Sequence, residues 1–133
     1  MSVILTLRTD KPEAEVGIYD ADGKQLSYHV WLAHRELSKT LHGVIRDELK
    51  KNEATLEDLA GIVVYQGPGS FTGLRIGITV ANALGHELKV PIVGAAHEES
   101  WLERGLERLS KGESDRLVMP EYGGEANITL QKK

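Results

Sequence analysis

The 133-residue sequence contains 16 basic and 20 acidic residues, which gives a formal net charge of −4, and it contains no cysteine. This length suits one domain with its own hydrophobic core, the acidic balance disfavours nonspecific binding of nucleic acid, and the lack of cysteine excludes disulfides and thiolate sites. No apolar stretch is long enough for a membrane span and the N-terminus lacks the features of a signal peptide, so we expect a soluble cytoplasmic protein with no membrane contact.

Three strands joined by short turns are predicted at the start of the chain. Their expected ranges are 3–7, 14–19 and 25–32. The first is apolar except for Thr6, as in a mostly buried strand, whereas apolar residues alternate with others from Leu26 to Leu32. An Asp-Gly hairpin turn at 20–23 separates the second strand from the third. The short connections favour an antiparallel meander.

A helix is predicted at 34–51, because apolar residues recur there at steps of three and four. They include Leu37, Leu41 and Ile45. A short helical turn follows at 55–59, with Thr55 as the N-cap and Asp58 placed to complete a capping box.

The second half of the chain predicts alternating strands and helices. The expected elements are a strand at 62–65, helices at 74–88 and 97–109, and a strand at 90–95. The order βββαβαβα predicts an α/β fold with a mixed five-stranded sheet, in which strand–helix–strand units add parallel pairs to the meander. We expect one lobe at 1–110, followed at 111–133 by a polar linker and tail that can hold a short strand at 117–119.

The stretch GPGSFTGLRIG at 67–77 connects a buried strand to a helix. Its glycines allow tight turning and close approach to the main chain, and Ser70 and Thr72 are good N-cap residues. The unpaired N–H groups at the start of a helix can bind an anion, which makes Gly67, Gly69, Ser70, Thr72 and Gly73 a weak candidate site for phosphate or a nucleotide. A purely structural turn, with glycines that serve helix–sheet packing, is the alternative.

Three better-known motifs are excluded at this loop. A Walker A loop needs Lys followed by Ser or Thr after its last glycine, the dinucleotide fingerprint needs its third glycine one residue earlier, and a nucleophile elbow needs glycine in place of Thr72. We therefore expect no catalytic residue here, and a helix-capping role for Ser70.

The same stretch closely resembles the TsaB (YeaZ) family, the bacterial accessory proteins of tRNA threonylcarbamoyladenosine synthesis. The resemblance extends from about residue 3 to residue 96. It implies a ribonuclease-H-like lobe of the actin/Hsp70/sugar-kinase superfamily, and it implies pairing with a catalytic TsaD subunit and a TsaE ATPase. Family members usually carry two such lobes, whereas this chain has room for one.

The turn after the first strand departs from the superfamily pattern. Active members carry an aspartate there that serves a metal-bound nucleotide, whereas this chain has Arg8, with Asp10 two residues later. Arginine cannot ligate Mg²⁺, so we expect no ATP hydrolysis and no cofactor in this chain, with ATP and Mg²⁺ entering only in an assembled complex. The five histidines lack the spacing of a zinc site, so we expect no metal site.

Small residues recur every four positions along the second helix. They are Gly73, Gly77, Ala81 and Gly85. Glycines inside a helix are unfavourable, so the stripe needs a reason, such as the close approach of another helix. That helix is either the chain's own first helix, through Leu41 and Ile45, or a partner's. By resemblance to the family, we expect Leu37, Leu41, Ile45, Gly77, Ala81 and Gly85 to lie at an interface with a TsaD-like protein, or with a second copy when the chain is alone.

Two functions from different classes follow. The first is a non-catalytic scaffold subunit for N6-threonylcarbamoylation of adenosine 37 in tRNA, which contacts tRNA only through the complex. The second is a nucleotide-dependent phosphotransferase or hydrolase of the actin-like superfamily, whose glycine loop binds phosphate directly.

Overall fold

The structure, a computed structural model, describes residues 2–97 and 99–121. Its strands are β1 (Val3–Arg8), β2 (Glu13–Asp20), β3 (Gln25–Leu32), β4 (Leu59–Gly67) and β5 (Ile92–Ala96). Its helices are α1 (Leu37–Lys51), α2 (Phe71–Leu88) and α3 (Trp101–Ser110), with short 3₁₀ helices η1 (His34–Glu36) and η2 (Leu56–Asp58). The predicted α/β class, mixed five-stranded sheet and element order are confirmed.

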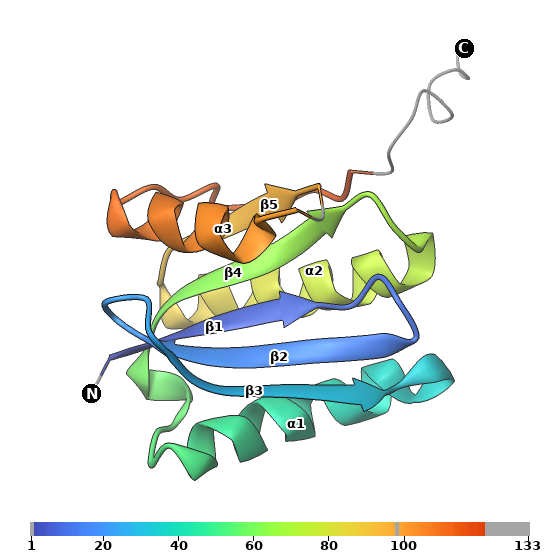
Figure 1. Cartoon of the computed structure of the whole chain (residues 1–133), viewed down its shortest axis with the longest axis horizontal. Helices are drawn as coiled ribbons and strands as arrows, with labels where there is room; N and C mark the ends of the chain where they lie inside the picture. Colours follow the sequence, from blue (N-terminus) through green and yellow to red (C-terminus); the bar gives the residue numbers. More distant parts are fainter. Residues whose placement is uncertain (1, 98, 122–133) are drawn as a thin grey trace.

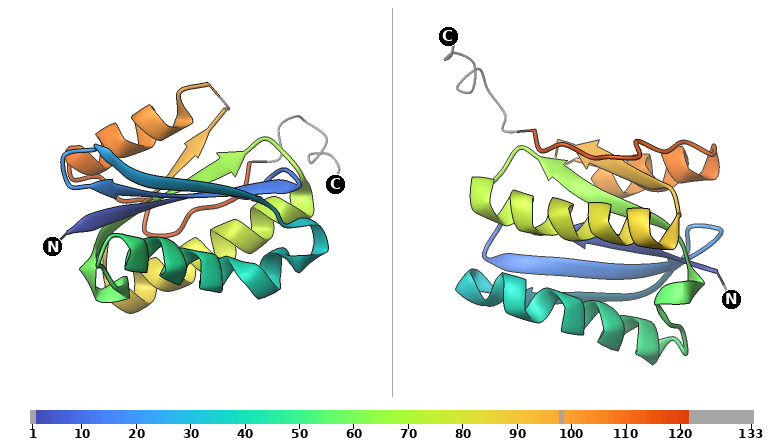
Figure 2. Two further views of the ribbon diagram at one scale, coloured as in Figure 1. Left: turned by 60° about the horizontal axis from the view of Figure 1, so that its bottom comes forward. Right: turned by 180° about the vertical axis from the view of Figure 1, so that it is seen from behind.

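The five strands form one sheet in the order β3-β2-β1-β4-β5. β1 and β2, and β2 and β3, pair antiparallel, whereas β4 lies parallel to both β1 and β5. Helices α1 and α2 cover one face of the sheet, and α3 lies on the other face beside β4 and β5 (Figures 1 and 2). Central β1 is buried along its whole length, in agreement with its mostly apolar sequence, VILTLR.

Local signals placed most elements well. β3 has the predicted bounds, and Thr55 and Asp58 form the predicted capping box at η2. β4 is longer than predicted at both ends, because β1 and β5 pair with it on either side. The predicted start of the third helix at residue 97 is wrong, because His97 and Ser100 have φ values of +68° and +60°, which a helix does not permit.

The predicted strand at 117–119 is also wrong. These residues have no strand partner; instead, the Asn82 side chain bonds both the N–H and the C=O of Val118, at 2.9 and 3.0 Å. The Gln66 side chain donates to the carbonyl of Met119. Side chains from α2 and β4 thus hold the segment against the lobe. The remainder of the predicted tail, 122–133, lies outside the described residues.

Candidate functional site

The glycine loop between β4 and α2 lies directly on the turn that follows β1. The Ser70 N–H donates to the carbonyl of Asp10 at 3.2 Å, and the Thr9 hydroxyl donates to the carbonyl of Gly73 at 2.7 Å. Both contacts join segments about sixty residues apart in the chain. The loop and the turn therefore form one unit at the carboxyl ends of β1 and β4.

Close packing against this turn explains the glycines at 69, 73 and 77. A Cβ at Gly69 would overlap Asp10, one at Gly73 would overlap the Thr9 carbonyl oxygen, and one at Gly77 would overlap the Thr9 hydroxyl. Gly67 has φ +120°, a conformation that favours glycine, and the Gly67–Pro68 peptide is cis. The contacts favour the structural interpretation of the loop.

Neither of the two hydroxyl side chains of the loop, Ser70 and Thr72, caps helix α2 as predicted. Ser70 occupies the N-cap position of α2, but its side chain makes no capping hydrogen bond, and Thr72 lies inside the helix. Both border an open groove of about 710 Å³, whose lining also includes Lys11, Arg35 and Glu36. Lys11 already pairs with Glu15 at 3.6 Å, so the positive end of the helix and Arg35 are what favour an anion there.

Arg8 and Asp10 form a buried ion pair beneath the loop. The Arg8 Nε donates to Asp10 Oδ1 at 2.7 Å and its Nη2 donates to Oδ2 at 3.2 Å, so both carboxylate oxygens are engaged. The guanidinium also stacks on the Tyr65 ring, 4.1 Å from its centre. Asp10 therefore does not replace the missing metal-binding aspartate, because ligating Mg²⁺ would require it to leave Arg8.

Two tyrosines lie on the same face of the sheet as Arg8. Burial raises the pKa of Tyr28, and its hydroxyl donates a hydrogen bond to the Glu15 carboxylate, which raises that pKa further. Burial also raises the pKa of Tyr19, with the Glu15 charge as the second cause. These phenols therefore stay protonated at neutral pH and act as hydrogen-bond donors rather than bases.

The residues predicted to face a partner lie in the protein's own core. This correction applies to Leu37, Leu41, Ile45, Gly77, Ala81 and Gly85. At three positions of the stripe of small residues on α2, the neighbour belongs to the turn after β1 or to the sheet: Gly73 and Gly77 pack against Thr9, and Gly85 packs against Ile92. A partner on this side would contact the outer residues of α1 and α2 instead.

Those outer residues form a groove of about 480 Å³ between α1 and α2, called here the α1–α2 groove. It is lined by Ser38, His42, Phe71, Thr72, Arg75, Ile76, Thr79 and Val80. Phe71 is 52% exposed, and the Arg75 guanidinium lies 5.3 Å from the centre of its ring. Phe71 was not predicted as a site residue, although Phe71, Arg75 and Thr79 follow one another at four-residue steps, which indicates one face of a helix.

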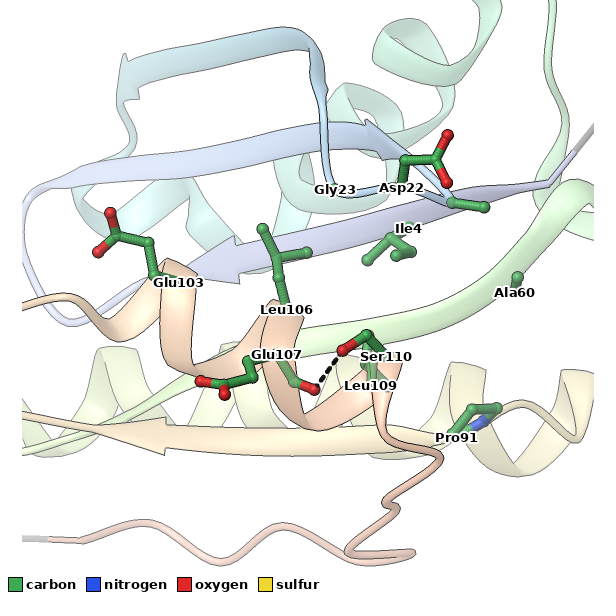
Figure 3. A pocket seen from close by; sticks show the side chains of 11 residues that line it. Ile4, Asp22, Gly23, Ala60, Pro91, Glu103, Leu106, Glu107, Leu109 and Ser110 are labelled. Carbon is green, nitrogen blue, oxygen red and sulfur yellow. Dashed lines mark hydrogen bonds between the residues drawn. The ribbon is translucent and has the colours of Figure 1, made fainter.

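A further cavity of about 470 Å³ lies on the α3 side of the sheet (Figure 3). Ile4, Leu106 and Leu109 supply apolar surface there, and Glu103 and Glu107 project from α3 (Figure 3). The Ser110 hydroxyl donates to the Glu107 carbonyl, so it is not placed as a nucleophile.

Among residues 2–97 and 99–121, no three His, Asp or Glu side chains are grouped to hold a metal ion. No helix in this part of the chain is long and apolar enough to span a bilayer.

Comparisons with known proteins agree with this fold. The family model "TsaD: tRNA N6-adenosine threonylcarbamoyltransferase" matches residues 31–120. The Escherichia coli tRNA threonylcarbamoyladenosine biosynthesis protein TsaB is 29% identical over 80% of this chain and 47% of its own length. The tRNA N6-adenosine threonylcarbamoyltransferase of Geotalea uraniireducens is 40% identical over 57% of this chain and 24% of its own.

Among solved structures, YeaZ from Pseudomonas aeruginosa superimposes with a TM-score of 0.68 at 28% identity. The match covers 84% of this chain and 51% of that one. The chain thus spans about half or less of the length of these relatives.

Proposed function

Since this chain belongs to the family of the TsaB (YeaZ) and TsaD proteins of tRNA threonylcarbamoyladenosine synthesis, we propose that it is a non-catalytic cytoplasmic subunit of that modification. It pairs with a TsaD-like catalytic subunit, and with a TsaE-like ATPase, for N6-threonylcarbamoylation of adenosine 37 in tRNA. ATP and Mg²⁺ enter only in the assembled complex.

The observation that carries the non-catalytic role is the Arg8–Asp10 pair. A nucleotide site of the superfamily type needs a carboxylate free to hold Mg²⁺ at the end of β1. Here the buried Arg8 occupies that position, and both carboxylate oxygens of Asp10 accept hydrogen bonds from it. Opening the pair would take the buried Asp10 carboxylate away from its ion partner, which is unfavourable.

The α1–α2 groove supports docking of the catalytic partner. It places an exposed phenylalanine and an arginine beside partly buried apolar residues, and aromatic residues and arginine are enriched at protein interfaces. The net charge of −4 supports a role in which tRNA is held by other subunits, because phosphate binding depends on basic surface.

Binding to a TsaD-like subunit tests this proposal. We expect the chain to co-elute with that subunit in size-exclusion chromatography, and Phe71→Lys to abolish co-elution while the melting temperature is unchanged. Glu57→Lys, in η2 and outside the α1–α2 groove, is the matched control and retains binding. Failure of the unaltered chain to bind, or binding by Phe71→Lys equal to the control, would contradict the proposal.

The groove beside Ser70 and Thr72 favours the second function, a nucleotide-dependent phosphotransferase or hydrolase, because its lining includes Arg35 and Lys11, although Glu36 also lines it. Calorimetric titration of the isolated chain with ATP–Mg²⁺ and with ADP, together with a phosphate-release assay, separates the two functions. We expect neither binding nor turnover. Micromolar affinity with turnover would favour the enzyme instead.

A further inference from the structure

One exposed side of α1 carries a row of basic residues, called here the α1 basic stripe. It consists of Lys39, His42, Arg46 and Lys50, which follow one another at steps of three and four and therefore lie on one side of the helix. Arg35 precedes them in η1. All five side chains are exposed. At a rise of 1.5 Å per residue, the stripe is about 16 Å long.

The stripe is basic although the chain as a whole is acidic. Residues 35–51 contain five basic and three acidic residues, whereas the complete sequence contains 16 basic and 20 acidic residues. The acidic excess therefore lies elsewhere in the chain. Charges on a protein surface act over a distance of about 10 Å at 0.1 M ionic strength, so a ligand that lies against α1 meets the stripe rather than the net charge.

Most of these cations are not neutralised by the protein itself. Lys39 lies 3.7 Å from Glu36, in an ion pair that is exposed on both sides. Arg46 and Lys50 take part in no ion pair within residues 2–97 and 99–121. Asp47 is the one exposed acid of α1. The stripe can therefore offer its positive charge to an external anion.

The stripe borders the α1–α2 groove but lies mostly outside it. His42 lines that groove, whereas Lys39, Arg46 and Lys50 do not. Positions 42, 46 and 50 each come one residue after a buried position of α1, which turns them about 100° around the helix from the core. α1 and α2 lie side by side on the outside of the sheet (Figure 2). A subunit docked in the groove therefore need not cover the three cations outside it.

We propose that the α1 basic stripe contacts the phosphate backbone of the tRNA that the complex modifies. This inference rests on the proposed function, which supplies a polyanion as the substrate. A row of separate cations suits a row of phosphates, which recur about every 3.4 Å along each strand of a duplex. The stripe itself contains no apolar side chain, unlike the core of a protein–protein interface, so it fits a polyanion better than an acidic protein.

The stripe adds contacts to those made by the other subunits. Because the chain carries a net charge of −4, we expect weak binding of tRNA by the chain alone and a measurable contribution in the complex. Phosphate contacts position a nucleic acid but carry no sequence information. The stripe therefore orients the tRNA on the complex, and it does not select adenosine 37.

Two matched double variants test the proposal in the complex with a TsaD-like subunit. Arg46→Gln/Lys50→Gln removes one arginine and one lysine from the stripe. Lys111→Gln/Arg116→Gln removes one of each from exposed positions beyond α3, near β5 at the opposite edge of the sheet from α1. Fluorescence anisotropy of a labelled, unmodified tRNA transcript measures Kd from 50 to 200 mM salt, and circular dichroism checks the fold of each variant.

We expect the stripe variant to bind tRNA more weakly at 50 mM salt, and the control variant to match the unaltered complex. The slope of log K against log salt should fall in magnitude by about two for the stripe variant, one for each lost phosphate contact. Between 50 and 200 mM salt, the unaltered complex then loses about tenfold more affinity than the stripe variant. A transcript with guanosine at position 37 should show the same difference, because no base is read.

Equal salt slopes for the stripe and control variants overturn the proposal. So does a stripe variant that no longer co-elutes with the TsaD-like subunit while the control does, because the stripe then faces an acidic protein surface. The proposed function fails separately, if the unaltered chain does not co-elute with that subunit. The same titration with the chain alone at 50 mM salt then decides the inference: tRNA binding that is absent, or equal for the two variants, overturns it.

Discussion

Replacing Gly73 with alanine tests whether the glycine loop is shaped by packing. In an open helix this change stabilises by about 1 kcal/mol, because glycine is a poor helix former. Here the new methyl group would overlap the Thr9 carbonyl oxygen, part of the backbone that cannot rotate away. Overpacking of this kind costs about 1–3 kcal/mol.

Relief of the overlap would also separate α2 from the turn after β1. The Thr9–Gly73 and Ser70–Asp10 hydrogen bonds would then weaken, each contributing about 1 kcal/mol. Against the gain in helix propensity, we expect a net loss of roughly 2 kcal/mol in the free energy of unfolding. That corresponds to a melting temperature about 8 °C lower for a chain of this length.

Gly43→Ala is the matched control, because Gly43 lies inside α1 and a Cβ there meets no atom within 4 Å. We expect it to raise the melting temperature by about 4 °C, from the same propensity gain of about 1 kcal/mol. Thermal and urea unfolding followed by circular dichroism measure both variants. A Gly73→Ala protein at least as stable as the unaltered chain would refute the packing explanation.

Two further predictions concern buried and partly buried ion pairs. Arg8→Met should lower the free energy of unfolding by about 3 kcal/mol, because Asp10 is left without its ion partner. Adding Asp10→Asn should recover part of this loss. Urea unfolding of the two single variants and the double variant measures the coupling, and additive effects would contradict the prediction. The hydrogen bond from Arg108 lowers the pKa of Asp115. The pair therefore stabilises the fold fully when the pH is above the pKa of an ordinary aspartate, and this stabilisation is lost as the pH falls through the lowered pKa. Asp115→Asn should therefore unfold at lower urea than the unaltered chain at pH 7, and the gap should close in acid; a gap independent of pH would exclude the charge as its cause.

Much of the fold was predictable because its signals are local. The alternation along β3, the period of α1, the Thr55–Asp58 box and the glycine-rich junction each lie within a few residues of the element that they specify. Element order then limits the sheet to a meander followed by parallel crossovers. The family resemblance was carried by the same short stretch around the glycine loop.

The contacts that give those residues their roles depended on the tertiary structure. The stripe of small residues on α2 was predicted from the sequence. Its contact with Thr9, through Gly73 and Gly77, was not, because the Thr9–Gly73 hydrogen bond joins residues 64 positions apart. The Asn82 side chain bonds the Val118 backbone across 36 positions, so the segment at 117–119, predicted as a strand, lies against α2 instead of joining the sheet. Arg8 and Asp10 are only two positions apart, yet their pairing depends on burial beneath the loop from β4 to α2. Sequence periodicity shows which face of an element is apolar or small, whereas the neighbour on that face is chosen by how distant segments pack.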